Sequence, residues 1–300
     1  MDNPQMLLTI KKVGNDAFKD KDYHKAIAIY TKGLSIEPTN TDLLSNRAAA
    51  YLNFGLYSKA LLDTETVLSS NPRHKKCLYR KVKALWGLCR YVEAQNFIKQ
   101  FNIKNLSDKA DTLVTQSQGN FKISEIKKLP NQARLDLANY RGPIEISPVE
   151  GKGRGILATD CIPVGTLILV EKAFCIVFDE DVDLCKKHHL TGKHQDDWSD
   201  EDTLVIRTAA MLKIDESLKE QIFDLYSGPD SLENMTDNDL MKTKSIVGLN
   251  FFSCSADESI VTAGKPNNAG LWVLPSYLNH SCPMISCLCY MLKGEWAEGP

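Results

Sequence analysis

Small and aromatic apolar residues return every 34 positions over about the first hundred residues of the chain. Three series carry this period: Tyr23, Tyr57 and Tyr91; Ala26, Ala60 and Ala94; and Gly14, Ala48 and Val82. Pro38 and Pro72 close the first two units, because proline lacks the N–H donor that a continuing helix needs. One unit cannot bury its own apolar face, so we expect three stacked helical pairs, capped by an amphipathic stretch from Ser107 to Leu129.

This period and these positions resemble tetratricopeptide repeats, whose unit is a helix-turn-helix of 34 residues. The resemblance implies an all-α superhelix over residues 1–130, with three repeats and a capping helix. A superhelix of this kind can be a scaffold without a specific ligand, so the fold alone leaves its function open.

The first helix of each predicted pair carries polar residues at matching places. They are Lys11 and Asn15, Asn46, and Lys76 and Arg80. The spacing i,i+4 within two of these helices puts both members on one face, and the superhelix brings those faces into one groove. Lysine, arginine and asparagine donate hydrogen bonds to carboxylates, and we expect no competing anion beside them. The alternative is that these charges only solvate helix faces.

The five positions resemble the carboxylate-clamp subclass of tetratricopeptide domains. That resemblance implies a partner, namely the acidic C-terminal Glu-Glu-Val-Asp peptide of large cytosolic heat-shock chaperones.

The pattern changes after residue 130 to short apolar or β-branched runs separated by glycine and proline. The segment 144–174 predicts a strand, a turn with Gly151, Gly153 and Gly155, a second strand, a Pro-Val-Gly turn at 163–165 and a third strand. A middle segment of about 179–244 is acidic, and apolar residues at helical intervals in DTLVIRTAAMLKI and SLKEQIFDLY predict helices there.

Three segments of this second part, in this order, resemble a SET domain of the SET-MYND type without the MYND finger. They are the glycine hairpin at 153–155, Asn250 in VGLNFF, and the run Asn279-His280-Ser281-Cys282-Pro283. The resemblance covers about 142–290 and implies a mostly-β domain, so the predicted fold class is multidomain α+β with domains 1–130 and 131–300.

The resemblance also implies S-adenosylmethionine as cofactor and a protein lysine as substrate. The backbone around Arg154, between Gly153 and Gly155, would flank the methionine part of the cofactor, and Asn250, Asn279 and His280 would hydrogen-bond it. Glycines permit a close backbone approach because they lack Cβ. A plain glycine turn, an Asx turn at Asn279 and a buried histidine at His280 are the alternatives.

The chain departs from that family in two places. Pro283 is followed by Met284 where the family commonly has asparagine, and the family's channel tyrosine is not found before Pro300. We therefore assign no catalytic residue and expect this 300-residue form to be weakly active or inactive. Either the sequence continues, or the alternative function holds: a non-catalytic chaperone adaptor with a degenerate SET domain.

Net charge, apolar runs and cysteine spacing limit which classes of partner and ligand we expect. A formal net charge of -2 gives no general attraction to nucleic acid, so no specific nucleic-acid partner is expected. No apolar run reaches the roughly 18 residues of a membrane span, which predicts a cytoplasmic protein, with nuclear entry left open. Nine scattered cysteines predict reduced thiols. Cys185, His188, His189 and His194 could ligate a metal, but their spacing favours a solvated loop, so no metal is predicted.

Overall fold

The computed structural model describes residues 3–126, 136–177, 199–228, 239–254 and 268–278. The chain divides into two compact units, Met1–Val114 and Thr115–Pro300. The predicted boundary after residue 130 stays a prediction.

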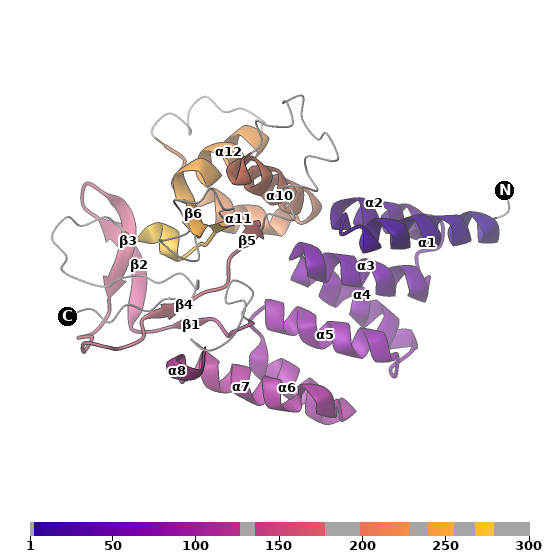
Figure 1. The fold of residues 1–300 in the computed structure, drawn as a ribbon, viewed down its shortest axis with the longest axis horizontal. Helices are drawn as coiled ribbons and strands as arrows, with labels where there is room; N and C mark the ends of the chain where they lie inside the picture. The colour runs from indigo at the N-terminus through magenta and orange to yellow at the C-terminus, as the bar shows by residue number, and fades with distance from the viewer. Residues whose placement is uncertain (1–2, 127–135, 178–198, 229–238, 255–267, 279–300) are drawn as a thin grey trace, which may run out of the picture. The chain divides into compact units, whose positions relative to one another are not determined.

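The N-terminal unit is built from paired helices (Figure 1). Their bounds are α1 Asn3–Lys19, α2 Tyr23–Leu34, α3 Thr41–Phe54, α4 Tyr57–Ser70, α5 Lys75–Gly87 and α6 Tyr91–Phe101. A 3-10 turn, η1 (Lys104–Leu106), leads into α7 (Ser107–Ser117), in which the unit ends, and α8 (Ile123–Ile126) belongs to the second unit. Consecutive helices pack against each other from α1 through α6, which confirms three helical pairs.

The periodic residues explain how these pairs form. Tyr23, Tyr57 and Tyr91 each begin the second helix of a pair, and the alanine three residues later is fully buried in every repeat. Gly14 lies against Tyr30: a Cβ at Gly14 would come within 2.4 Å of the Tyr30 ring. The two helices of the first pair therefore approach more closely there than an alanine would allow.

Local hydrogen bonds define the helix ends. Asn40 caps the amino end of α3 through its side chain, and Gly55 ends α3 in the left-handed conformation with φ of 90°. Pro38 and Pro72 lie in the turns that follow α2 and α4, as their lack of a donor requires.

The second unit combines small antiparallel sheets with helices. Strand β1 (Tyr140–Arg141) pairs with β4 (Leu169–Val170), and β2 (Ile144–Val149) pairs with β3 (Gly153–Ala158). A third sheet has the order β5-β7-β6, from Cys175–Val177, Asn268–Leu271 and Phe251–Cys254. Besides α8, the described part of this unit contains the helices α10 (Asp200–Ile214), α11 (Lys219–Phe223) and α12 (Asp239–Asn250), with 3-10 turns η4 (Glu216–Leu218) and η5 (Pro275–Tyr277).

Helix packing forms the core of this unit. Helix α10 packs on α12 and on strands β5 and β7 (Figure 1). Leu204, Leu212, Ile246 and Leu271 are buried at this junction. The predicted helical segments are confirmed, since DTLVIRTAAMLKI lies in α10 and SLKEQIFDLY contains α11 and the last two residues of η4.

The predicted hairpin is also confirmed, but of its three glycines only Gly151 lies in the turn, because β3 begins at Gly153 and includes Gly155. Strands β2 and β3 pair in register from Ile144 opposite Ala158 to Val149 opposite Gly153. A mostly-β domain is not confirmed: the described part of the second unit has sheets of only two or three strands beside its helices. The SET domain itself stays a prediction.

Candidate functional site

Helices α1, α3 and α5, the first of each pair, carry the five predicted clamp residues. Lys11, Asn15, Asn46 and Arg80 are partly buried, and Lys76 is exposed. The structure joins four of them to neighbouring side chains of the same unit, described below. For Lys76 the described residues show no hydrogen bond or ion pair.

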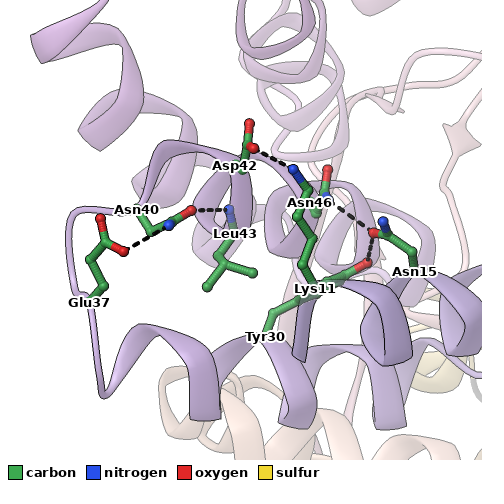
Figure 2. Close-up of polar contacts among 8 residues, drawn as sticks. All are labelled: Lys11, Asn15, Tyr30, Glu37, Asn40, Asp42, Leu43 and Asn46. Carbon is green, nitrogen blue, oxygen red and sulfur yellow. Dashed lines mark hydrogen bonds and ion pairs between the residues drawn. The ribbon is translucent and has the colours of Figure 1, made fainter. Parts of the chain in front are cut away.

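Asn15 and Asn46 contact each other directly (Figure 2). The Asn46 Nδ2 donates to the Asn15 Oδ1 at 3.0 Å, and the Tyr30 hydroxyl donates to the same oxygen at 2.8 Å. Tyr30 is 1% exposed. Burial raises the pKa of Tyr30 to about 12, so its hydroxyl stays protonated and can donate.

Arg80 is held on α3 by Ser45. Its Nη1 donates to the Ser45 carbonyl oxygen at 2.7 Å and also to the Ser45 hydroxyl, which accepts from Cys77 Sγ at 3.4 Å as well. Burial lowers the pKa of Arg80, but a guanidinium remains charged in proteins. Arg80 also acts electrostatically on Tyr30, whose hydroxyl bonds Asn15, so the guanidinium lies near the asparagine pair.

Lys11 has an anionic neighbour that the sequence analysis did not expect. Its ammonium forms an ion pair with the Asp42 carboxylate of α3 (Figure 2). The side chains are 37% and 61% exposed, so solvent screens this pair. The expectation of a groove without a competing anion was wrong: Asp42 lies 31 residues after Lys11, which places it beside Lys11 on the next repeat.

The sequence separation of the contacting residues could have predicted these contacts. Lys11 to Asp42 and Asn15 to Asn46 are both separated by 31 residues, and Ser45 to Arg80 by 35. These separations fall close to the 34-residue period, because equivalent helices of adjacent repeats lie side by side.

The glycine hairpin is the first segment of the predicted cofactor region that the structure describes. Gly153 has a φ of 73°, and a Cβ there would meet no atom within 4 Å. Gly155 is buried opposite Ser147 in the hairpin register. The turn therefore leaves open space beside a backbone conformation that favours glycine.

Arg154 reaches across to two other segments. Its guanidinium donates to the Asp224 carboxylate and carbonyl and lies 5.3 Å from the centre of the Tyr277 ring. The Tyr277 hydroxyl donates to Asp224 at 2.7 Å. The hydrogen bond from Arg154 lowers the pKa of Asp224, and burial raises the pKa of Tyr277 to about 12. These contacts tie the hairpin to the residues just before Asn279.

Asn250 ends α12 and is buried. Its Nδ2 donates to the carbonyl oxygens of Tyr226 and Ile246, each at 2.7 Å. Among the residues that the structure describes, none donates a hydrogen bond to its Oδ1. Asn279 and His280 lie outside the described residues, so the structure does not bring the predicted cofactor residues together as a set.

Glu171 is a partly buried carboxylate that the sequence analysis missed. It accepts a hydrogen bond from the Leu274 N–H at 3.0 Å, and its backbone carbonyl accepts from the Trp272 indole at 3.2 Å. Burial raises its pKa from 4.5 to about 7. No local pattern marked it, because a glutamate followed by Lys172 at the end of an apolar run is typical of an exposed strand end.

The described residues offer neither a cluster of metal ligands nor a helix that could cross a membrane. Those residues contain no cluster of three or more His, Cys, Asp or Glu side chains suited to a metal ion. Cys185, His188, His189 and His194 fall outside them. Among the helices described, none combines the length and the apolar character that crossing a membrane requires.

Comparisons with known proteins relate the chain to two kinds of protein, and no family model matches it. It is 23% identical over 318 residues to a methyltransferase of Gibberella zeae, covering 91% of this chain and 43% of that protein. It is 32% identical over 136 residues to tetratricopeptide repeat protein 4 of Bos taurus, covering 41% of this chain and 35% of that protein. It is 37% identical over 90 residues to the Hsp70/Hsp90 co-chaperone CNS1 of Saccharomyces cerevisiae, covering 29% and 23%.

The chain thus spans less than half the length of each of these relatives. Together with the 34-residue period and the paired helices, the second relative identifies the N-terminal unit as a tetratricopeptide-repeat module.

Proposed function

We propose that the N-terminal unit binds the C-terminal carboxylates of an acidic peptide, of the Glu-Glu-Val-Asp kind that ends large cytosolic heat-shock chaperones. One observation carries this proposal: donors from adjacent repeats lie next to each other, with Asn46 bonded to Asn15 and Arg80 bonded to Ser45. Similarity to a co-chaperone supports it. The proposal includes a cytoplasmic location and leaves nuclear entry open.

The chemistry of the groove suits such a ligand. Two carboxylates at the end of a peptide need donors held in place, and charge-assisted hydrogen bonds from lysine and arginine are about twice as strong as neutral ones. Arg80 uses one nitrogen on Ser45, which leaves its other N–H groups for a ligand. The exposed ammonium of Lys76 lies one helical turn before Arg80 on α5 and adds a second cation.

Peptide binding tests this function. A labelled pentapeptide ending in Glu-Glu-Val-Asp should bind with its free carboxylate and bind much more weakly when amidated. Charge reversal of the pair, Lys76→Glu with Arg80→Glu, should weaken binding by about a hundredfold or more, because like charges replace two cationic donors.

A control with the same charge change separates local from general electrostatics. Lys99 and Lys104 are exposed and lie on α6 and η1, not on the helices that carry the clamp residues, so Lys99→Glu with Lys104→Glu should change affinity only slightly. Equal losses in both double variants, or no loss in the first, would refute the clamp.

For the second unit we propose an S-adenosylmethionine-dependent protein-lysine methyltransferase of the SET type. The support is the hairpin with open space at Gly153, the buried Asn250 with a remaining acceptor, and the methyltransferase relative along 91% of the chain. When bound, the cofactor supplies an electrophilic methyl group.

The chain's own residues would bind and orient the cofactor. The Gly153 backbone would approach it closely, and Arg154 would hold that turn in place through Asp224.

Calorimetric titration with S-adenosylmethionine tests this second function, and two glycines provide a matched pair of variants. Gly153 and Gly165 both have positive φ, 73° and 83°, and both face open space, so valine strains the backbone similarly at each. Gly153→Val should abolish saturable heat, whereas Gly165→Val should retain it. Equal behaviour of the two variants would refute the placement of the site. No heat from the unsubstituted chain would favour a non-catalytic adaptor.

A further inference from the structure

The Asn15 side chain has one acceptor oxygen, and two donors converge on it (Figure 2). The Tyr30 hydroxyl of α2 approaches from the buried side at 2.8 Å, and the Asn46 Nδ2 of α3 approaches at 3.0 Å. Within the described part of the N-terminal unit, no residue accepts a hydrogen bond from the Asn15 Nδ2.

These two donors decide which way the Asn15 carboxamide points. A carboxamide can be turned over, which exchanges its oxygen and its NH2 group. If Asn15 turned over, its NH2 group would face the Tyr30 O–H and the Asn46 N–H. At least one of these two donors would then have no acceptor. An unsatisfied buried donor is unfavourable, so the observed orientation is held. In that orientation the NH2 is the group left for a ligand.

We propose that Tyr30 is a positioning residue of the clamp: it fixes the Asn15 carboxamide so that the NH2 group, and not the oxygen, meets the peptide carboxylate. This inference rests on the clamp proposed above. The reversed carboxamide would present an oxygen to a carboxylate, which repels it, so the orientation matters for affinity as well as for the free protein.

The fold provides the place for this hydroxyl. The Tyr30 ring packs against Gly14, where even an alanine Cβ would lie 2.4 Å from the ring. Its burial keeps the hydroxyl away from water, so the bond to Asn15 has little competition. The charged groups that act on Tyr30 are Arg80, which favours its ionised form, and Asp16, which opposes it. With the pKa raised to about 12, the donor is present throughout the physiological range.

Tyr30→Phe tests the role, because phenylalanine keeps the ring and removes only the hydroxyl. The free-carboxylate pentapeptide should bind this variant about three- to tenfold more weakly, the range that one hydrogen bond supplies. Tyr23→Phe is the matched control. Tyr23 lies in the same repeat, and its ring contacts Phe18. Removing the Tyr23 hydroxyl should leave the affinity for the peptide unchanged.

Two readouts separate positioning from a general structural effect. In an Asn15→Ala background, Tyr30→Phe should cause no further loss of affinity, because the carboxamide that it orients is gone. In the peptide-free chain, the Asn15 side-chain NH2 signals in a ¹⁵N NMR spectrum, identified by their loss in Asn15→Ala, should shift in Tyr30→Phe but not in Tyr23→Phe.

The outcomes are distinct. Equal affinity of Tyr30→Phe and the unsubstituted chain overturns this inference and leaves the clamp standing. A loss that persists at full size in the Asn15→Ala background also overturns it, since Tyr30 would then act through the fold. If the unsubstituted chain does not bind the peptide, the clamp fails and the positioning role fails with it.

Discussion

Gly14→Ala should destabilise the first helical pair, although alanine is the better helix former. A Cβ at residue 14 would lie 2.4, 2.8 and 3.0 Å from three atoms of the Tyr30 ring. Real Cβ contacts are longer than this, so the ring or α1 must move. Tyr30 is only 1% exposed, and its ring has little room to move without disturbing its neighbours.

The magnitude follows from two opposing effects. Alanine gains about 0.5–1 kcal/mol over glycine within a helix, because it loses less backbone entropy on folding. Overpacking a buried contact costs about 1–3 kcal/mol. The packing cost is larger, so the variant should be less stable by about 0.5–2 kcal/mol. A displaced Tyr30 should also weaken peptide binding through Asn15.

Hydrogen exchange measured by mass spectrometry is the suitable assay, because it reports the opening free energy of peptides from α1 and α2 separately from the second unit. Gly248→Ala is the control. Gly248 lies in α12, and its nearest neighbour is the Glu201 carboxylate oxygen at 3.1 Å, the far end of a flexible side chain. That variant should be neutral or slightly stabilised. A Gly14→Ala chain as stable as the unsubstituted one would refute the reasoning about close helix approach.

Two further predictions concern charged groups. Asp42→Asn should raise affinity for the acidic peptide about two- to fivefold, because an exposed ion pair of up to about 1 kcal/mol no longer occupies Lys11, and the gain should shrink at high salt. Weaker binding of this variant, by fluorescence anisotropy, would show that Asp42 instead orients Lys11. For Glu171, a folded-state pKa of about 7 lies above the ordinary 4.5, so its protonated form is favoured by folding. Considering Glu171 alone, the stability of the second unit should be highest below pH 4.5 and should fall as the pH rises from 4.5 to about 7. Glu171→Gln should remove that decline, worth about 3 kcal/mol, in urea titrations at several pH values, and an unchanged slope would contradict the assigned burial.

Much of the architecture could be predicted because it depends on short-range patterns. The tyrosine and alanine series mark the second helix of every pair, and the glycine turn marks the β2–β3 hairpin. The helices of the middle segment followed from apolar residues at helical spacing. How much of the second domain is β structure could not be predicted in the same way, and the mostly-β domain that we expected is not confirmed. Strand β7 pairs with β5 across a long stretch of chain, from Leu271 to Cys175, and no local pattern reports such a pairing.

The sequence by itself determined which residues recur, and therefore which faces of α1, α3 and α5 carry equivalent side chains. Only the tertiary structure decided what those side chains contact. Asp42 forms an ion pair with Lys11, and the Tyr30 hydroxyl donates a hydrogen bond to Asn15. In the second unit it brought Arg154 to Asp224 across 70 residues. The physical reason is that backbone periodicity arises from neighbours a few positions apart, whereas a side-chain partner is chosen by how separate helices and turns pack.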